Sequence, residues 1–321
     1  MSSGAPKIQA RVTEVTAVNE LIKTFRFVPR DGGPVPPFSG GSHIVVEMND
    51  NGTRRLNPYS LMSDPSDTTG YAISVRRDDC GRGGSLYMHN HVEPGMEMTI
   101  SYPVNLFPED TRARKHLLLA GGIGITPFIA QMAQMDERNA HFELHYAVAS
   151  RKLGQFGDEL KRSYENRVHL YYDDENIRMD IPALLRGQPL GTHVYVCGPK
   201  GMIAYVHDMA DKAGWPKGAV HSEEFLAPPV GEAFTVELAK SEKTIRVGAT
   251  QSLLEAIEAA GVDAPYLCRG GACGQCECDV VVADGDIEHN DHWLTPEQRA
   301  SQKKIMPCVS RFAGERLVLD L

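Results

Sequence analysis

The spacing of four cysteines near the C-terminal end constrains this chain more than any other feature. Cys268, Cys273 and Cys276 lie in PYLCRGGACGQCECDV at a C-x4-C-x2-C spacing, and Cys308 follows in IMPCVS after 31 intervening residues. This is the spacing of plant-type 2Fe-2S ligation. In such a site one tight loop and one distant residue must bring four thiolates to two irons.

The residues between these cysteines support a cluster over other metal sites. Gly270, Gly271 and Gly274 supply backbone conformations and clearance that a Cβ would forbid. A zinc site usually shows two C-x2-C pairs or added histidines, and a Rieske cluster needs two histidine ligands. Neither pattern is present. Cys278, two residues beyond Cys276, is predicted to be a small packing residue.

Length, charge and apolar content narrow the class of protein. A chain of 321 residues predicts two or three domains, and a formal net charge of −9 argues against nucleic acid as a partner. No stretch approaches the roughly 20 apolar residues of a membrane span, and the first residues lack the apolar core of a secretory signal. We therefore expect a cytoplasmic protein with no membrane partner. In a reducing compartment, clustered cysteines favour metal over disulfides.

Three segments differ in their hydrophobic pattern. Residues 1–110 contain short alternating runs separated by turn clusters, which predict an antiparallel barrel or sandwich. Residues 111–228 alternate strand and helix signals, which predict a doubly wound parallel sheet. Residues 229–321 begin with a predicted hairpin and a helix ended by Gly261, followed by the cysteines. The Pro-rich stretch LAPPVGEA (226–233) is predicted to be a linker.

The second segment carries a nucleotide-binding pattern. HLLLAGGIGITPF runs from a strand through Gly121, Gly122 and Gly124 into a helix, where backbone amides favour a pyrophosphate. This glycine run alone is weak evidence, and its alternative is an ordinary strand-to-helix turn. A second strand, VYVCGPKGM, ends at Cys197. Two such strand ends side by side would flank a ligand crevice, so we predict a nicotinamide-side role for Cys197.

The first segment carries two patterns that suit a flavin. RRLNPYSL places Tyr59 and Ser60 at a strand end, where an aromatic ring can cover a flat ligand. GRGGSLYMH combines an arginine with bare backbone amides, which suits a phosphate. Taken singly, the first pattern is equally well explained as a surface tyrosine and the second as a charged turn. Together they gain weight, because a hydride carries two electrons and a 2Fe-2S cluster accepts one, and a flavin converts between them.

With PYS, RGGS, GGIGITP, CGP, EEF and C-x4-C-x2-C…C in this order, the chain resembles the phthalate dioxygenase reductase family over essentially its whole length. The resemblance implies a multidomain α/β and β protein. It would have an antiparallel β-barrel flavin domain, a doubly wound parallel α/β nucleotide domain and a C-terminal β-grasp 2Fe-2S ferredoxin domain. It also implies FMN rather than FAD, NADH as the donor with NADPH possible, and a monomer.

The resemblance also implies roles for individual residues. The flavin would be contacted by Tyr59, Ser60, Ser74, Val75, Arg76, Arg82, Gly83, Gly84 and Ser85. The nucleotide would be contacted by Gly122, Ile123, Gly124, Ile125, Thr126, Pro127, Ser150, Arg151, Cys197, Gly198 and Pro199. Phe225 would cover the flavin ring near the exit to the ferredoxin domain. The residues closest to the reaction would be Thr126, Cys197 and Phe225, and the cluster ligands would be Cys268, Cys273, Cys276 and Cys308.

Two positions depart from the family pattern. An arginine often stands two residues before the tyrosine, but here that residue is Asn57, and Arg55 is displaced by two positions. Where many NADH-preferring relatives have an acidic residue after the second strand of the nucleotide domain, this chain has Arg151 and Lys152, which could accommodate a 2′-phosphate. NADH remains the expected donor.

The resemblance implies a reductase that passes single electrons to the oxygenase component of a Rieske non-haem iron oxygenase. Residues 234–321 hold 9 Lys/Arg and 14 Asp/Glu, a formal charge of −5. This acidity suits docking onto a basic patch, or it serves solubility alone. The alternatives are a reductase for another metalloenzyme, such as a diiron monooxygenase, and a redox sensor that does not turn over.

Overall fold

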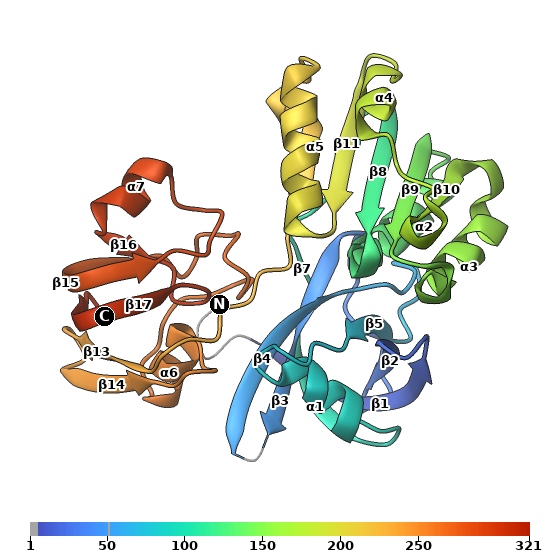
Figure 1. Cartoon of the computed structure of the whole chain (residues 1–321). Helices are drawn as coiled ribbons and strands as arrows, with labels where there is room; N and C mark the ends of the chain where they lie inside the picture. Colours follow the sequence, from blue (N-terminus) through green and yellow to red (C-terminus); the bar gives the residue numbers. More distant parts are fainter. Residues whose placement is uncertain (1–5, 51) are drawn as a thin grey trace.

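The computed structural model describes residues 6–50 and 52–321, which form three units, each built on its own sheet (Figure 1). The first unit is an antiparallel sheet in the order β4-β3-β6-β1-β2-β5, with β7 paired to β3. Its strands are β1 (Lys7–Ala17), β2 (Ile22–Pro29), β3 (Ser42–Asp50), β4 (Thr53–Ser60), β5 (Tyr71–Arg76), β6 (Glu97–Ser101) and β7 (Val104–Asn105).

One backbone bridge closes this sheet into a barrel. Leu61, directly after β4, pairs with Ile73 of β5, so the two end strands of the sheet meet. Side chains alternate between the two faces of a strand, and Phe25 and Phe27 of β2 are both fully buried in the barrel. The helix α1 (Gly84–His91) follows β5 and packs on the same core. The predicted barrel is confirmed.

The second unit is a parallel sheet in the order β10-β9-β8-β11-β12. Its strands are β8 (Lys115–Gly121), β9 (Phe142–Val148), β10 (Val168–Tyr172), β11 (Thr192–Cys197) and β12 (Val220–Glu223). The helices α2 (Thr126–Glu137) and α3 (Gln155–Tyr164) cover one face, and α4 (Ile181–Arg186) and α5 (Lys200–Lys212) cover the other. Because both faces are covered, the central strand β8 is apolar along most of its length.

Five 3-10 turns occur in this second unit. They are η1 (Gly122–Ile125), η2 (Arg151–Leu153), η3 (Glu165–Arg167), η4 (Asp173–Glu175) and η5 (Lys217–Ala219). The first of them, η1, lies between β8 and α2 at the carboxyl edge of the sheet. This is the edge at which parallel sheets bind ligands.

The first and second units pack closely at the segment that joins them. Phe107 contacts the rings of Phe128 and Tyr195, with ring centroids 5.8 Å apart in each pair. Gln131 of α2 donates a hydrogen bond to the carbonyl oxygen of Phe107 at 2.6 Å. A Cβ on Gly41 would lie 2.1 Å from that same oxygen. The joint is therefore tightly packed, which fixes the flavin-type barrel against the parallel sheet.

The third unit is a mixed sheet in the order β14-β13-β17-β15-β16, in which β13 and β17 are parallel. Its strands are β13 (Phe234–Leu238), β14 (Lys243–Val247), β15 (Cys278–Glu288), β16 (Lys304–Ile305) and β17 (Arg311–Leu319). The helix α6 (Leu253–Ala259) packs on the sheet, and α7 (Pro296–Ser301) precedes β16. This arrangement is the predicted β-grasp type. Residues 224–233, which join it to the second unit, form neither helix nor strand.

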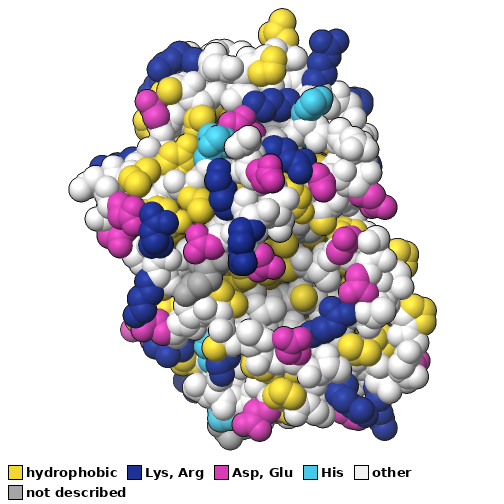
Figure 2. Space-filling model, turned by 90° about the vertical axis from the view of Figure 1, so that its right-hand side faces the viewer, with side chains coloured by type: hydrophobic (Ala, Val, Ile, Leu, Met, Phe, Trp, Pro, Cys, Tyr) yellow, Lys and Arg dark blue, Asp and Glu magenta, His cyan; other side chains and the backbone are white. Residues whose placement is uncertain are grey.

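Charged side chains of both signs are mixed over the face that the first and second units present in Figure 2. The negative net charge of −9 is therefore not concentrated on that face. Within the described residues, no helix combines the length and the apolar character needed to cross a membrane.

Most predicted elements are present, and the missed ones are mainly short. The sequence did not predict β2, β7, α4, β12, α7, β16 or β17. Of these, β12 has 4 residues and α4 has 6, too few for a periodic pattern to develop. Breaks between the sheets fall at residues 105–115 and 223–234, around the predicted boundaries of 110 and 228. Those boundaries stay predictions.

Candidate functional site

The four cysteines of the predicted cluster converge in the third unit. A hydrogen bond from the Cys273 thiol to the Cys268 sulfur lowers the pKa of Cys268 to about 5. In the same way the Cys308 thiol hydrogen-bonds to the sulfur of Cys276 and lowers its pKa. Three of the four are buried, and Cys273 is half-buried. One loop and one distant residue therefore bring four sulfurs together, as the spacing predicts.

Backbone amides also point at these sulfurs. The Gly270 N–H donates a hydrogen bond to Cys268 Sγ at 3.3 Å. The Gly271 N–H donates to the sulfur of Cys308, which by itself lowers the pKa of that thiol. Amide donors stabilise negative charge on sulfur and tune cluster potentials. The donor set therefore fits a 2Fe-2S cluster, which accepts and releases single electrons when bound. Cys278 stands apart, buried at the start of β15 in the core of this unit.

Two of the three predicted loop glycines are required by the geometry. Gly271 and Gly274 have φ values of 72° and 75°, and a Cβ on Gly274 would lie 2.2 Å from the Trp293 ring. The prediction for Gly270 is wrong, because no atom lies closer than 3.8 Å to its Cβ position and its φ is ordinary. Arg269 instead adopts a left-handed φ of 54°.

A segment that the sequence did not single out braces the cluster loop. In this bracing loop (residues 289–294) the His292 N–H donates to the carbonyl oxygen of Gly271 at 3.0 Å. Trp293 Nε1 donates to Glu277 at 2.9 Å, and half of its side chain is exposed to solvent. A large aromatic group therefore stands between the cluster loop and the surface. Its only sequence signal is a tryptophan in an otherwise polar stretch.

The predicted flavin-phosphate turn meets one face of β4. Arg55, Asn57 and Tyr59 share this face because side chains alternate along a strand. A Cβ on Gly84 would lie 2.3 Å from Asn57 Nδ2, and a Cβ on Gly83 would lie 3.4 Å from Arg55 Nη2. Gly83 also has a φ of 98°. The bare backbone at the start of α1 therefore faces the guanidinium of Arg55 and the side-chain amide of Asn57, which donates to the Tyr59 hydroxyl at 3.3 Å.

This turn has the features of a phosphate site. The Arg55 side chain is nearly buried, and its Nε lies 3.6 Å from Asp50 Oδ2 in an ion pair but has no hydrogen-bond partner among the described residues. Burial raises the pKa of Tyr59 to about 12, so its hydroxyl stays a donor. Helix amides and a guanidinium together favour a phosphate, and the two glycines leave a cradle that a Cβ would fill. The residues therefore fit FMN. Arg55 stands two positions before the place of the family arginine, but its guanidinium still supplies a positive charge at this turn.

Two other residues of the predicted phosphate loop have protein partners. Arg82 is paired with Glu255 of α6, with 2.7 Å between Nη1 and Oε2. Ser85 Oγ accepts a hydrogen bond from the Asp78 N–H at 3.0 Å. The loop is therefore tied both to its own unit and to the third unit.

The remaining predicted flavin residues lie at the ends of β4 and β5. Ser60 is buried at the end of β4, and Ser74 Oγ lies 2.6 Å from a threonine hydroxyl of β2. The carbonyl of Val75 is paired with His89 Nε2 at 2.8 Å, and Arg76 is exposed. Residues 74–76 of β5 lie just beyond the bridge between Ile73 and Leu61 and pair with β2 on one side.

The predicted nucleotide crevice lies where β8 and β11 end side by side, in parallel register. A Cβ on Gly124, in η1, would lie 2.3 Å from the carbonyl oxygen of Cys197, and a Cβ on Gly121 would lie 2.7 Å from Pro199. The two glycine-containing turns are thus in direct backbone contact. The juxtaposition that the sequence predicted is present.

The start of α2 and the end of β11 frame this crevice. Thr126 is buried, and its hydroxyl donates to the Ile123 carbonyl at 3.0 Å, which anchors the first turn of the helix. Burial raises the pKa of the Cys197 thiol, which is therefore neutral, and the neighbouring Glu223 adds to this. Burial also raises the pKa of Glu223 to about 8, and its Oε2 has no partner among the described residues. Glu223 was not predicted from the sequence.

The residues predicted for nucleotide selectivity lie after β9. Ser150 directly precedes η2, and Arg151 forms two hydrogen bonds of 2.9 Å with Glu175. The Arg151 guanidinium also lies 4.2 Å over the ring of Tyr172. Its charge is therefore compensated within the protein.

Phe225 lies between the second and third units and is about half exposed. The adjacent Glu224 pairs with His292 of the bracing loop at 2.8 Å. Asn290 of that loop also donates to the Ala227 carbonyl at 3.0 Å. The segment after β12 is thus joined to the bracing loop, which in turn contacts the cluster loop at Gly271.

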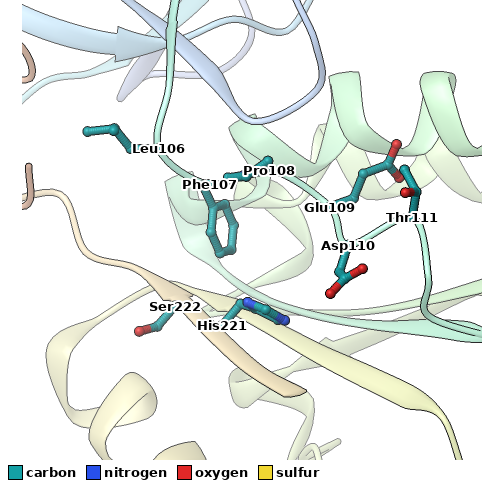
Figure 3. Close-up of a pocket in the computed structure, with 8 residues that line it drawn as sticks. All are labelled: Leu106, Phe107, Pro108, Glu109, Asp110, Thr111, His221 and Ser222. Atoms are coloured by element: carbon teal, nitrogen blue, oxygen red, sulfur yellow. The ribbon is translucent and has the colours of Figure 1, made fainter. Parts of the chain in front are cut away.

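Figure 3 shows a surface pocket of about 430 Å³, lined by residues 106–111 and by His221 and Ser222 of β12. The Phe107 ring points toward β12, whereas Glu109 points away from it. None of the residues predicted to bind nucleotide or flavin lines this pocket. It belongs to the joint between the first and second units.

Comparison with known proteins gives matches over the whole chain. The family model of the dimethylamine monooxygenase subunit DmmA-like N-terminal domain matches residues 101–220, and that of the 2Fe-2S iron-sulfur cluster binding domain matches residues 236–313. The carnitine monooxygenase reductase subunit of Acinetobacter baumannii is 46% identical, covering 100% of both chains. The heme-dependent oxidative N-demethylase beta subunit of Ectopseudomonas mendocina is 44% identical, covering 98% of this chain and 99% of its own. The solved structure of phthalate dioxygenase reductase matches with a TM-score of 0.88 and 33% identity, over 99% and 98% of the two chains.

Proposed function

The chain belongs to the phthalate dioxygenase reductase family, and from this membership we propose that it takes a hydride from NADH and delivers single electrons to the terminal component of an oxygenase system. It is an NAD(P)H-dependent iron–sulfur flavoprotein oxidoreductase with FMN and a 2Fe-2S cluster as cofactors. A flavin supplies the step between two-electron and one-electron chemistry when it is bound.

The observation that carries this proposal is the placement of the three sites in one chain. The nicotinamide crevice lies at the carboxyl edge of the parallel sheet, and the phosphate turn lies in the barrel that packs against that sheet. The third unit, which holds the four thiols, contacts the phosphate turn through Arg82 and Glu255. The barrel unit thus contacts both the unit that would bind the nicotinamide and the unit that would hold the cluster, which supports electron transfer in that order.

At the hydride-donating end the chain acts by orientation. The contact between Gly124 and Cys197 sets the width of the crevice, and positioning of this kind can supply several kcal/mol of a barrier. The buried Cys197 thiol remains neutral, so no charged nucleophile faces the nicotinamide. The pairing of Arg151 with Glu175 compensates the positive charge that a 2′-phosphate would need, which supports NADH over NADPH.

For the acceptor we propose the oxygenase component of a Rieske non-haem iron system. Two relatives that match over nearly their full length are named as reductases of carnitine monooxygenase and of phthalate dioxygenase. The formal charge of −5 on residues 234–321 suits a basic docking patch on such a partner.

A haem-dependent oxygenase is a second candidate acceptor. It is favoured by the match to the heme-dependent oxidative N-demethylase beta subunit, whose identity to this chain is close to that of the carnitine monooxygenase reductase subunit.

Anaerobic titration tests the shared part of the proposal. NADH should bleach both a flavin band and an iron–sulfur band, NADPH should act more weakly, and the released flavin should be FMN. If neither NADH nor NADPH reduces the protein, the proposal is refuted. Oxygenase partners recovered from the source cells and tested for NADH-dependent turnover then separate a Rieske acceptor from a haem acceptor.

A further inference from the structure

Arg82 and Glu255 form a nearly buried ion pair between the first and third units. Arg82 Nη1 lies 2.7 Å from Glu255 Oε2, and the two side chains are 11% and 6% exposed. The carbonyl oxygen of Thr250 accepts hydrogen bonds from Arg82 at 3.4 Å and from Arg55 at 3.5 Å. The turn before α6 therefore rests on the two arginines that adjoin Gly83.

Both sides of this contact are held rigidly. Glu255 is part of a capping box, in which its Oε2 accepts from the Ser252 N–H at 2.8 Å while its own N–H donates to Ser252 Oγ at 3.1 Å. The buried Arg311 supports the same turn from within the third unit, donating to the carbonyls of Gln251 at 3.0 Å and Gly248 at 3.3 Å. The ion pair therefore joins two fixed elements.

A second acid of α6 extends the contact toward the cluster loop. Glu258 lies one helical turn after Glu255, so both side chains share a face. Glu258 Oε2 lies 3.9 Å from Arg54 Nη1 of β4, and its other oxygen pairs with Arg269. Arg269 directly follows Cys268. The face of α6 that meets the barrel is thus linked to the residue next to a predicted cluster ligand.

We propose that Arg82 is a positioning residue that couples binding of the flavin phosphate to docking of the third unit against the barrel. This inference rests on the proposed function, because the phosphate is that of FMN. A guanidinium has five N–H donors in a fixed fork. In Arg82, Nη1 is taken by Glu255 and Thr250, which leaves donors for a phosphate at the adjacent Gly83–Gly84 turn.

The arrangement predicts that substitutions of the two partners both weaken docking but differ in their effect on FMN binding. Arg82→Gln removes a donor from both the phosphate and Glu255, so FMN binding and docking should both weaken. Glu255→Gln keeps the capping box, which accepts glutamine, but loses the charge that holds Arg82. Docking should weaken, whereas FMN should bind at least as tightly, because an anion that competes for Arg82 has been removed.

The test uses the full-length protein with its cluster, stripped of flavin and titrated with FMN by fluorescence quenching. Docking is measured with FMN bound, as the rate of proteolytic cleavage within residues 226–233 and as the radius of gyration from X-ray scattering. Arg82→Gln should raise the Kd for FMN about tenfold or more, and Glu255→Gln should leave it equal or lower. Both variants should be cleaved faster. Glu237→Gln, which breaks an exposed pair with Arg316 inside the third unit, is the matched control and should change neither readout.

Three results would overturn the coupling: Arg82→Gln changes only one of the two readouts, Glu255→Gln weakens FMN binding, or Glu255→Gln is cleaved at the wild-type rate. If Arg82→Gln does not fold, Glu255→Gln decides alone through the direction of its two effects. A wild-type protein that takes up no FMN would refute the proposed function itself. That result is distinct from normal FMN uptake with unaffected variants, which would refute only the coupling.

Discussion

Replacement of Gly124 by alanine tests whether its contact with Cys197 forms the hydride-transfer crevice. A Cβ at this position would lie 2.3 Å from the Cys197 carbonyl oxygen and 2.5 Å from its carbonyl carbon, whereas ordinary contact begins at 3.4 Å. These are backbone atoms held in a parallel sheet, so they cannot turn aside as a side chain would. The two strand ends must therefore separate by about 1 Å, and a misplacement of that size can cost about 100-fold in rate.

The assay is anaerobic stopped-flow reduction by NADH, followed at a flavin band. Gly124→Ala should be reduced about 100-fold more slowly, with unchanged flavin and iron–sulfur spectra, because those sites lie in other units. Gly201→Ala is the matched control. It lies in α5 of the same unit, and no atom lies within 4 Å of its Cβ position. This control should be reduced at the wild-type rate and should melt at an equal or slightly higher temperature.

The stability of Gly124→Ala must be measured as well, since overpacking costs about 1–3 kcal/mol. That loss should lower the melting temperature without unfolding the protein at the temperature of the assay. A folded Gly124→Ala protein that NADH reduces at the wild-type rate would refute the assignment of this crevice.

Three further predictions concern the crevice and the cluster loop. The pKa of Glu223 in the folded protein is about 8, above its ordinary value of 4.5, so the folded state holds an extra proton between these pH values. Stability should therefore fall as pH rises through this window, and a melting-temperature profile of Glu223→Gln should lose that slope. Because Trp293 stands half exposed between the cluster loop and the surface, we expect a protein electron acceptor to contact it. Trp293→Ala should then slow reduction of cytochrome c by about tenfold or more while leaving ferricyanide reduction unchanged; equal rates of cytochrome c reduction in the variant and the wild type would contradict this contact. Gly274→Ala, whose Cβ would lie 2.2 Å from the Trp293 ring, should lower the iron content, whereas Gly248→Ala, with no contact below 3.6 Å, should not.

The parts of the site that the sequence predicts are those made by residues close together in the chain. The cluster loop carries three of its four thiols within nine residues, so its spacing alone limits the chemistry. The turn formed by the glycines before α2 could likewise be predicted from the sequence, because its strand, turn and helix follow one another along the chain. The helix α2 and the strand β8 were also predicted, since the helical pattern of α2 extends over several turns and β8 is a continuous apolar run that ends in glycines.

Contacts between distant segments could not be predicted in this way. Nothing near Arg82 in the chain indicates Glu255, because their pairing depends on how the third unit packs against the barrel. The unpartnered carboxyl oxygen of Glu223 is a property of its burial beside Cys197, not of its neighbours in sequence. The left-handed backbone of Arg269 was missed because glycine is the residue expected there.

The shared face of Arg55, Asn57 and Tyr59 bears on how members of this family are found. A search pattern that requires the arginine at a fixed distance from the tyrosine would reject this chain, although its guanidinium lies beside the glycine turn. A step of two residues along a strand preserves the face and shifts the Cα by about 7 Å, which a long, flexible arginine side chain can partly recover. A diagnostic pattern should therefore accept an arginine at either of the two positions on that face, and it would then detect relatives in which this charge has moved along the strand.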